Sequence, residues 1–535
     1  MRTVSVITLI ASVFISSVTY GEDWPQWMGQ NRDGVWNEKH VVDAIPEGGL
    51  PVKWRVPVRH GYSGPAVAKG RVFVMDYDTA GEVSNNPSGI SDLTGEERVL
   101  CFDAKTGAEI WKHSYPQAYK ISYAGGPRCT PTVHGDKVYA LGAQGQLTCL
   151  RTSNGKVVWE KSLPEVYKTK TAVWGYASHP LIDGELLFTL AGGQDSVCVA
   201  LNKDTGEEVW TALSADEPGY NAPTMIQHAG VKQLLIWTPN GLNSLNPQTG
   251  EVHWTIDLKP GFAMSIMGIQ KQGRYLYASA IGNISAMIEL DDEKPAAKVV
   301  WRGNVKSSIF CSNSTPLLDE GTIYGCDVET GTLMAADMKT GKRLWQTTKP
   351  TDNSPRRSRH ATAFLVKQND RYLLFNELGD LILADLTPEA YTELGRFHVL
   401  EPTNEAFGRS VVWSHPAYAE RSLFARNDKE LVCVDLADPR SKKLGQTLRE
   451  ECLVLMREGD GSHETYEEAL NIIEKACTLV PNNPNYLAAK AWALCRTDRT
   501  DKAYMLLEEV DEMLKLPAWQ DTDTQQEVSK IRRMF

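Results

Sequence analysis

The chain has little positive charge for its length. Among its 535 residues, 56 lysines and arginines stand against 67 aspartates and glutamates, which gives a formal net charge of -11. Proteins that bind nucleic acid usually present a strongly basic face, so this balance argues against nucleic acid as a partner. The sequence also contains no C-x-x-C pair and no cluster of histidine and cysteine with zinc spacing. A structural metal site therefore has no support.

The apolar run near the N-terminus, Val4 to Val18, is too short for a comfortable membrane span. It follows Arg2 and precedes Thr19-Tyr20-Gly21, which has small residues at the two positions that a signal peptidase reads. Residues 1–21 are therefore predicted to be a cleaved export signal, and no transmembrane span is expected after cleavage. The first cysteine is Cys101, so no lipidation site follows the signal. We expect a periplasmic or cell-envelope protein that is not a lipoprotein.

What the sequence does contain is a repeat, most legible at residues 103–111 as DAKTGAEIW. Further copies end at an aromatic residue, with weaker copies at the last two positions named here: Trp159, Trp210, Trp254, Trp345, Trp301 and Phe397. Counted from Trp54, the terminal aromatic residues are separated by 57, 48, 51, 44, 47, 44 and 52 residues. A period near fifty is typical of an array of supersecondary units.

Each copy combines a tight turn with a strand that ends in tryptophan. The glycine of the copy follows Thr or Asn and suits a turn with positive φ. Two further short strands precede each hairpin, as in TPTVHGDKVYALG at 130–142. Four antiparallel strands per repeat, without intervening helices, predict an all-β fold, a β-propeller with one blade per repeat. Eight blades result if the strand that carries Trp54 supplies the missing outer strand of the last repeat, which removes the open edges.

Ten cysteines in an exported chain would ordinarily indicate disulfides. Four of them are predicted to share one position in the third strand of different blades: Cys101, Cys149, Cys198 and Cys433. Equivalent positions in different blades lie beyond the roughly 7 Å between α-carbons that a disulfide tolerates. We therefore expect these four thiols to be free and buried.

The hairpin pattern A-x-D-x-x-T-G-x-x-x-W resembles the repeat of pyrroloquinoline-quinone (PQQ) propellers. This family includes quinoprotein alcohol dehydrogenases and the outer-membrane assembly factor BamB. The resemblance covers residues 50–437 and implies a PQQ-like eight-bladed propeller. It leaves the activity open, because the same fold hosts both dehydrogenases and binding proteins. BamB is typically a lipoprotein, which this chain is not expected to be.

Residues at the entrance to each innermost strand are expected to converge on one mouth of the central channel, the default place for a ligand. The ligand-binding candidates there, or just before these strands, are Tyr62, Arg128, Trp174, Tyr176, His179, Tyr220, Asn221, Asn313, Arg359, His360, Trp413 and His415. The pattern assigns no catalytic residue.

Several of these candidates suit a planar anion. Arg128 and Arg359 could hold a carboxylate bidentately, as the tricarboxylate PQQ would require. Trp174 or Trp413 could stack on a ring, and the three histidines could titrate near neutral pH. The alternative is a polar channel that holds water, in which each residue only satisfies its neighbours.

The resemblance implies features of the dehydrogenases that this chain lacks. Those enzymes use a ring formed by adjacent cysteines, a calcium ion bound by Glu, Asn and Asp, and an aspartate base. This sequence has no adjacent cysteines and no acidic residue among the entrance positions. The prediction is a non-catalytic binding or scaffold protein, BamB-like in architecture, with a protein partner or small ligand at the mouth. PQQ with calcium remains possible, and the alternative is a periplasmic PQQ-dependent dehydrogenase of alcohols or sugars.

The remaining segments flank the propeller, which is placed at residues 50–445. Residues 22–49 form an N-terminal arm with three tryptophans, either an aromatic recognition surface or an arm packed against the propeller. Residues 446–535 show helical periodicity that recurs after 34 residues and resembles the tetratricopeptide repeat. The protein is expected to be a monomer.

Overall fold

The computed structural model describes residues 21–85, 89–515 and 522–533. The predicted export signal lies outside these residues except for Gly21. One compact unit runs from Glu22 to Pro439, and another comprises Arg440–Met513 together with the segment that begins at Thr522.

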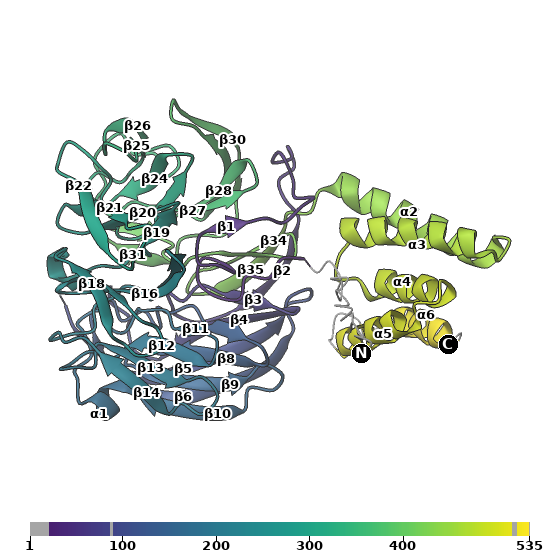
Figure 1. Cartoon of the computed structure of the whole chain (residues 1–535), viewed down its shortest axis with the longest axis horizontal. Coiled ribbons are helices and arrows are strands. Elements are labelled where there is room, and N and C mark those ends of the chain that lie inside the picture. The colour runs from purple at the N-terminus through teal and green to yellow at the C-terminus, as the bar shows by residue number, and fades with distance from the viewer. Residues whose placement is uncertain (1–20, 86–88, 516–521, 534–535) are drawn as a thin grey trace, which may run out of the picture. The chain divides into compact units, whose positions relative to one another are not determined.

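The first unit is a β-propeller of eight blades, as predicted (Figure 1). The first strands of neighbouring blades contact one another, as β3 does with β7 and β33, so they lie innermost. Blades 1 and 2 consist of β3 (Ala66–Ala68), β4 (Arg71–Asp78), β5 (Ser91–Asp103), β6 (Glu109–Ile121), β7 (Thr132–His134), β8 (Lys137–Leu141), β9 (Gln146–Arg151) and β10 (Val157–Ser162). Blades 3 and 4 consist of β11 (Leu181–Asp183), β12 (Leu186–Leu190), β13 (Cys198–Asn202), β14 (Glu208–Ala212), β15 (Thr224–His228), β16 (Val231–Thr238), β17 (Gly241–Leu245) and β18 (Val252–Ile256).

The remaining blades follow the same plan. Blades 5 and 6 consist of β19 (Gln270–Gln272), β20 (Tyr275–Ala280), β21 (Ile284–Leu290), β22 (Ala297–Arg302), β23 (Leu317–Asp319), β24 (Thr322–Asp327), β25 (Thr332–Asp337) and β26 (Arg343–Thr347). Blades 7 and 8 consist of β27 (Ala363–Gln368), β28 (Arg371–Asn376), β29 (Asp380–Leu386), β30 (Tyr391–His398), β33 (Ala417–Ala419), β34 (Ser422–Arg426), β35 (Glu430–Asp435) and β2 (Val52–Pro57). Short elements lie between blades, namely α1 (Leu163–Tyr167), η1 (Gly261–Ala263), β31 (Asn404–Ala406) and β32 (Arg409–Val411).

The ring closes as the aromatic period predicts. Strand β2 pairs antiparallel with β35, and Trp54 faces Cys433 across the pair. The N-terminal strand thereby completes blade 8. Blade 7 departs from the prediction because it has five strands: β1 (Val35–Trp36) adds in parallel to the innermost strand β27.

The repeated tryptophan joins a blade to the next one in six of the eight copies. Trp111 of blade 1 donates from Nε1 to the carbonyl of Thr152, in the turn of blade 2, at 2.8 Å. A Cβ on Gly155 of that turn would meet the Trp111 ring at 2.5 Å, so this glycine is required by close approach as well as by its φ of +68°. The outer-strand tryptophans at 54, 159, 210, 301 and 345 make the same bond to the next turn.

The four repeated cysteines are buried and free. The pairing of the third and fourth strands shows that one of the four cysteines does not share the predicted position. Cys101 faces Trp111, whereas Trp210 faces Ala200, so Cys198 lies two residues before the position that Cys101 occupies. All four still point into the packing between sheets, where burial raises the pKa of the thiols.

The second unit is helical. It contains α2 (Pro439–Glu458), α3 (His463–Leu479), α4 (Pro484–Arg496), α5 (Thr500–Leu514) and α6 (Thr522–Arg532). Helix α3 begins after Ser462, whose side chain accepts a hydrogen bond from Thr465 N, and packs against α4. The likeness to a tetratricopeptide repeat stays a prediction. No helix in the described part of the chain is long and apolar enough to cross a membrane.

Candidate binding site at the channel mouth

The innermost strands all begin at one end of the central channel, and we call this end the mouth face. Because strands alternate in direction within a blade, two kinds of connection lie there: those that enter an innermost strand and those between second and third strands. Helix α1 belongs to such a connection, and Figure 1 shows it on the mouth face. The tight turns lie on the opposite face.

The N-terminal arm fills the channel. Its three tryptophans, Trp24, Trp27 and Trp36, are buried, so they form no exposed recognition surface, and the packed arrangement is the observed one. Trp24 pairs through its main chain with Val67 of β3, at 2.8 Å in both directions. The arm also bonds or packs against the innermost strands or their entrances in the other blades, through Val133, Pro180, Pro223, Gly268, Leu317, Lys367 and Tyr418.

At the tip of the arm, Arg32 and Trp27 lie deep in the channel. The Arg32 guanidinium donates to the carbonyls of His179, Pro180 and Pro223, with a distance of 2.9 Å to Pro223. Its Nε donates to Gln26 Oε1 at 2.9 Å. Burial lowers the pKa of Arg32 to about 9. This side chain therefore ties blades 3 and 4 together from inside the channel.

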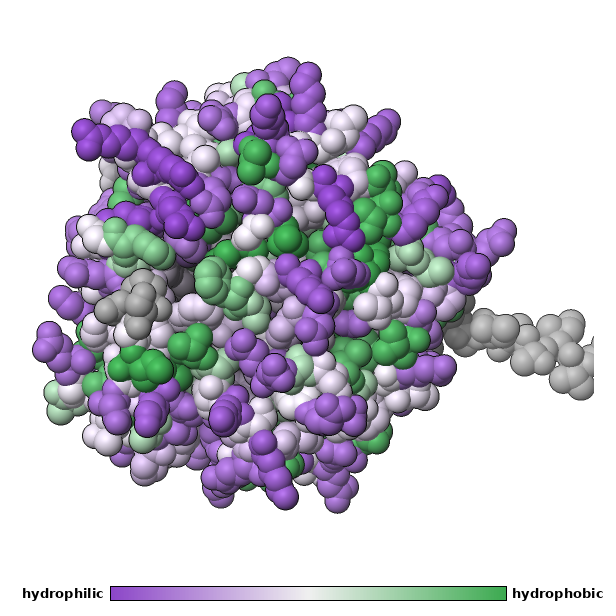
Figure 2. Space-filling view, turned by 90° about the vertical axis from the view of Figure 1, so that its left-hand side faces the viewer, coloured by the Kyte–Doolittle hydropathy of each residue, from purple (hydrophilic) through white to green (hydrophobic). Residues whose placement is uncertain are grey.

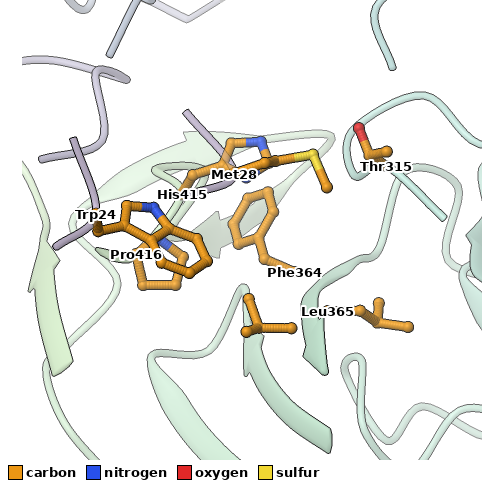
Figure 3. Close-up of a pocket in the computed structure, with 8 residues that line it drawn as sticks. Trp24, Met28, Thr315, Phe364, Leu365, His415 and Pro416 are labelled. Atoms are coloured by element: carbon orange, nitrogen blue, oxygen red, sulfur yellow. The ribbon is translucent and has the colours of Figure 1, made fainter. Parts of the chain in front are cut away.

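A small pocket lies beside the arm. It has a volume of about 10 Å³ and is lined by Trp24 and Met28 of the arm and, on blades 6 to 8 and their entrances, by Thr315, Phe364, Leu365, Val366, His415 and Pro416 (Figure 3). This volume is roughly enough for one water molecule. The pocket therefore has no room for a ring system such as a quinone.

Arg128 has its donors committed to the main chain. Its Nε donates to the carbonyl of Trp174 at 3.0 Å, and its terminal nitrogens donate to the carbonyls of Gly126, Ser122 and Tyr123. The guanidinium also lies over the ring of Tyr62, 5.4 Å from the centroid. Arg128 therefore holds the connection between blades 1 and 2 in place, and its donors are not free for the predicted carboxylate.

A second group gathers around buried Glu377 and adjoins the first, since the ring of Trp413 lies 6.2 Å from that of Tyr123, whose carbonyl accepts from Arg128. Its carboxylate accepts from Arg409 Nε at 2.7 Å and from Trp413 Nε1 at 3.1 Å, and burial raises its pKa. His360 stacks on Phe407 with centroids 4.5 Å apart. The structure thus brings His360 and Trp413 together, and Asn313 joins them by a 2.9 Å contact to His360 Nδ1.

Three of the remaining candidates lie around Arg128. Its guanidinium covers the ring of Tyr62, its Nε donates to the carbonyl of Trp174, and Trp174 packs against Tyr220 with centroids 5.8 Å apart. Arg359 instead points to Glu329 at 3.1 Å and is far more exposed than the others. The side chains of Tyr176 and Asn221 are buried between blades, where they donate to the carbonyls of Ala191 and Met267. Arg359, Tyr176 and Asn221 therefore do not join the group around Arg128.

The three histidines do not titrate near neutral pH, contrary to the prediction. Burial lowers the pKa of His360 to about 4 and that of His415 to about 3. His179, whose Nδ1 accepts from Thr130 N and whose ring stacks on Trp27 at 4.7 Å, is held well below its ordinary pKa by burial. The Nδ1 of His179 acts as an acceptor, and the ring is a packing element.

The entrance positions contain no acidic residue, but Glu377 lies at the mouth outside these positions. It follows the second strand of blade 7, β28, and connections after second strands open on the mouth face as well. Considering those connections beside the entrance positions would have found it. Phe407 and Arg409 belong to the β31–β32 hairpin, which has no counterpart in the repeat.

The exposed large hydrophobic residues are distributed unevenly over the propeller. Phe262 is 77% exposed and Phe407 is 45% exposed. Both lie in mouth-face connections, as do Ile90, Val166, Val173 and Val305. In the described part of the propeller, the other exposed large hydrophobics lie in outermost strands, and none lies in the turns of the opposite face. Figure 2, which looks onto the side where α1 lies, shows hydrophobic residues near the middle of a mainly hydrophilic face.

Comparisons with known proteins agree with the fold. The family model described as outer membrane protein assembly factor BamB matches residues 95–347 and 239–451. No curated protein matches in sequence. BamB from Moraxella catarrhalis is similar in structure with a TM-score of 0.47, at 13% identity, over 72% of this chain and 97% of that chain. Quinohemoprotein alcohol dehydrogenase from Comamonas testosteroni is similar with a TM-score of 0.51, at 12% identity, over 80% of this chain and 85% of that chain.

At such low identity, likeness to solved structures shows the propeller fold and no activity. The family model rests on the sequence itself, and its two matched ranges together span more than half of the chain. The protein therefore belongs to the family of PQQ-repeat propellers described as outer membrane protein assembly factor BamB.

Proposed function

We propose that this chain is exported, that residues 1–21 are removed, and that the mature propeller is a non-catalytic binding protein of the cell envelope. The observation that carries the proposal is the arrangement along the channel axis. The arm closes the channel, while exposed apolar side chains collect in the mouth-face connections above it. Such residues on loops of a rigid scaffold are typical of a protein-binding surface.

The kind of partner follows from the chemistry of this surface. Phe262 and Phe407 stand on separate connections, both at positive φ (+56° and +51°), and both rings are exposed. Arg409 lies 6.0 Å from the Phe407 ring centroid, so one aromatic anchor sits beside a cation. Aromatic anchors with arginine are enriched at protein interfaces. A folded protein with an apolar patch suits this surface best.

The residues of the mouth do not fit PQQ. A tricarboxylate needs guanidinium groups whose N–H donors are free to face it. The nitrogens of Arg128 donate to main-chain carbonyls instead, and Arg359 pairs with Glu329. Glu377, a buried carboxylate at the mouth, already accepts from Arg409 and Trp413. Below the mouth, Trp27 and His179 occupy the axis as a stacked pair. The dehydrogenase alternative therefore lacks support from this geometry.

Calorimetric titration of the purified protein with PQQ and calcium should give only heats of dilution, and the quinone absorbance should not co-elute on gel filtration. Arg128→Ala should behave in the same way. If Arg128 did hold the quinone, its loss would weaken binding by about 1.5–3 kcal/mol, the range for hydrogen bonds to charged groups. A one-to-one isotherm that disappears in Arg128→Ala would favour the dehydrogenase.

Site-specific photo-crosslinking in cells tests the binding surface. A crosslinking residue at position 262 or 407 should yield a discrete adduct with an envelope protein. The same residue at position 209, which is 51% exposed on the outermost strand β14, serves as the matched control and should yield none. Phe262→Asp should weaken binding of the captured partner about tenfold or more, since aromatic anchors contribute about 2 kcal/mol at interfaces. Equal adducts at all three positions would contradict a mouth-face site.

A further inference from the structure

The arm begins with a main-chain nitrogen that lies against a buried carboxylate. Glu22 N donates to Oε2 of Glu38 at 2.6 Å. The Glu38 side chain is 6% exposed, and its Oε1 lies 3.5 Å from Nε of Arg421. A carboxylate buried to this degree is costly unless positive charge and donors surround it.

Acidic groups outnumber cations around this contact. The carboxyl groups that face it are those of Glu22, Asp23, Glu38 and Glu420, and Glu420 N donates to Glu22 O at 3.3 Å. Burial, followed by repulsion from Asp23, raises the pKa of Glu420 to about 7. The nearby cations are Arg421, Lys53 and, beside Asp23, Lys69, and Lys53 also lies 3.5 Å from Asp435. The cluster would accommodate one more positive charge.

We propose that removal of residues 1–21 supplies that charge and thereby locks the arm in the channel. Hydrolysis of the Gly21–Glu22 bond consumes one water, leaves a carboxylate on Gly21 of the released signal, and turns the Glu22 nitrogen into an α-ammonium group. That ammonium lies at hydrogen-bond distance from Glu38 without any movement of the arm. The inference rests on the export and cleavage proposed above.

The uncleaved chain offers Glu38 only a neutral amide. An ammonium adds the attraction of a full opposite charge to this hydrogen bond, and a buried carboxylate gains most from a paired opposite charge. The segment from Glu22 to Trp36 is held at its start by this contact and at its end by β1 pairing with β27. Processing therefore strengthens one of the attachments of the arm, the one at its first residue.

Two chains that differ by one residue test the proposal: one begins at Glu22, and the other begins at Gly21, which displaces the ammonium by one residue. At pH 7, amide hydrogen exchange in the segment 22–36 should be about tenfold or more faster in the chain that begins at Gly21. This is the effect of weakening a hydrogen bond to a charged group by about 1.5 kcal/mol. Equal exchange in the two chains would overturn the proposal.

The difference between the two chains should depend on pH in a defined direction. A free α-amino group has a pKa of about 7.7–8.0, and pairing with Glu38 raises it in the folded state. A raised folded-state pKa means that the stabilisation is complete below the free value and disappears as pH rises through the folded value. The melting temperatures should therefore differ at pH 7 and converge toward pH 10. Glu22, Asp23, Glu420, His40 and Arg421 are present in both chains, so their titration cancels in the comparison.

Glu38→Gln is introduced both into the chain that begins at Glu22 and into the chain that begins at Gly21. It should abolish the difference in amide hydrogen exchange between them. Because this variant removes a buried group and can fail to fold, acetylation of the Glu22 nitrogen provides an independent test. Acetylation keeps an N–H but removes the charge, and it should reproduce the fast exchange. A difference that survives Glu38→Gln, or acetylation without effect, would refute the ion pair.

N-terminal sequencing of the protein recovered from cells separates this inference from the proposed export. A mature chain that does not begin at Glu22 would refute the proposed cleavage and the ion pair with it. A chain that begins at Glu22 but shows no dependence of arm exchange on its ammonium would refute the ion pair alone.

Discussion

Replacing Trp159 with alanine is expected to lower the free energy of unfolding by about 3–5 kcal/mol, the range for truncating a buried aromatic side chain. Trp159 is only 9% exposed and packs against Tyr139 with centroids 6.1 Å apart. Its Nε1 donates to the carbonyl of Lys203 in the turn of blade 3 at 2.9 Å. The substitution therefore removes packing within blade 2 and a bond to blade 3 at once. Urea unfolding followed by circular dichroism measures the loss.

Val157→Ala is the matched control, because Val157 lies two residues away in the same strand and is 43% exposed. It should change the stability by no more than about 0.5 kcal/mol. Similar losses of unfolding free energy in the two variants would show that the tryptophan has no special role in joining blades.

The same joint can be tested from the glycine side. A Cβ on Gly206 would meet the Trp159 ring at 2.7 Å, whereas a Cβ on Gly184 would meet nothing within 4 Å. Both glycines have positive φ, +72° and +58°, so alanine is strained in the backbone at either position. The additional loss in Gly206→Ala over Gly184→Ala isolates the contact with the tryptophan ring.

These contacts explain why the fold could be predicted from the sequence. The glycine and the tryptophan of neighbouring copies touch each other, so the repeat places both at fixed spacing, and the spacing between Trp54 and Phe397 gives the number of blades. The closing strand could be inferred because the strand that carries Trp54 has no partner in its own repeat, whereas the last repeat has only three strands. Pairing the two completes the last blade. The pairing of β1 with β27 had no comparable signal, since two residues carry no periodicity.

The site was predicted less well because its residues obey no repeat. Arg128 looked like an anion ligand by type and position, but the connection around it leaves main-chain carbonyls that only a guanidinium in this place satisfies. Glu377 and Phe407 were missed because they lie outside the entrance positions. The sequence shows which positions face the mouth, whereas the use of each side chain depends on which main-chain groups remain unpaired nearby.

The arm illustrates the same limit. Its three tryptophans predicted packing, yet nothing in the sequence indicates that residues 22–36 enter the channel and contact every blade. That arrangement depends on positive φ at Met28 and Arg32, +59° in each case, which folds the tip of the arm into a compact loop. Neither residue type predicts such a conformation.

Replacing Arg32 with alanine should therefore have the second large effect, a loss of about 3 kcal/mol or more. Arg32 is only 7% exposed, and its guanidinium is a donor to the carbonyls of His179 and Pro223 inside the channel. Each buried carbonyl left without its donor costs about 1–3 kcal/mol. Arg32→Lys should recover little of this stability, because an ammonium cannot reproduce the planar fork that spans several carbonyls.

Arg55→Ala provides the comparison for Arg32→Ala. Arg55 has a side chain that is 42% exposed, pairs with Glu430 at 2.8 Å and donates to one carbonyl, that of Val399, at 2.7 Å. Its loss should therefore cost less than that of Arg32, about 1–2 kcal/mol. The fluorescence of the buried tryptophans of the arm should shift to longer wavelength in Arg32→Ala and stay unchanged in Arg55→Ala, because only the first change lets water reach Trp27. If Arg32→Ala unfolds at the same urea concentration as Arg55→Ala, the hydrogen bonds of Arg32 add no stability. The contact between blades 3 and 4 then depends on the innermost strands alone.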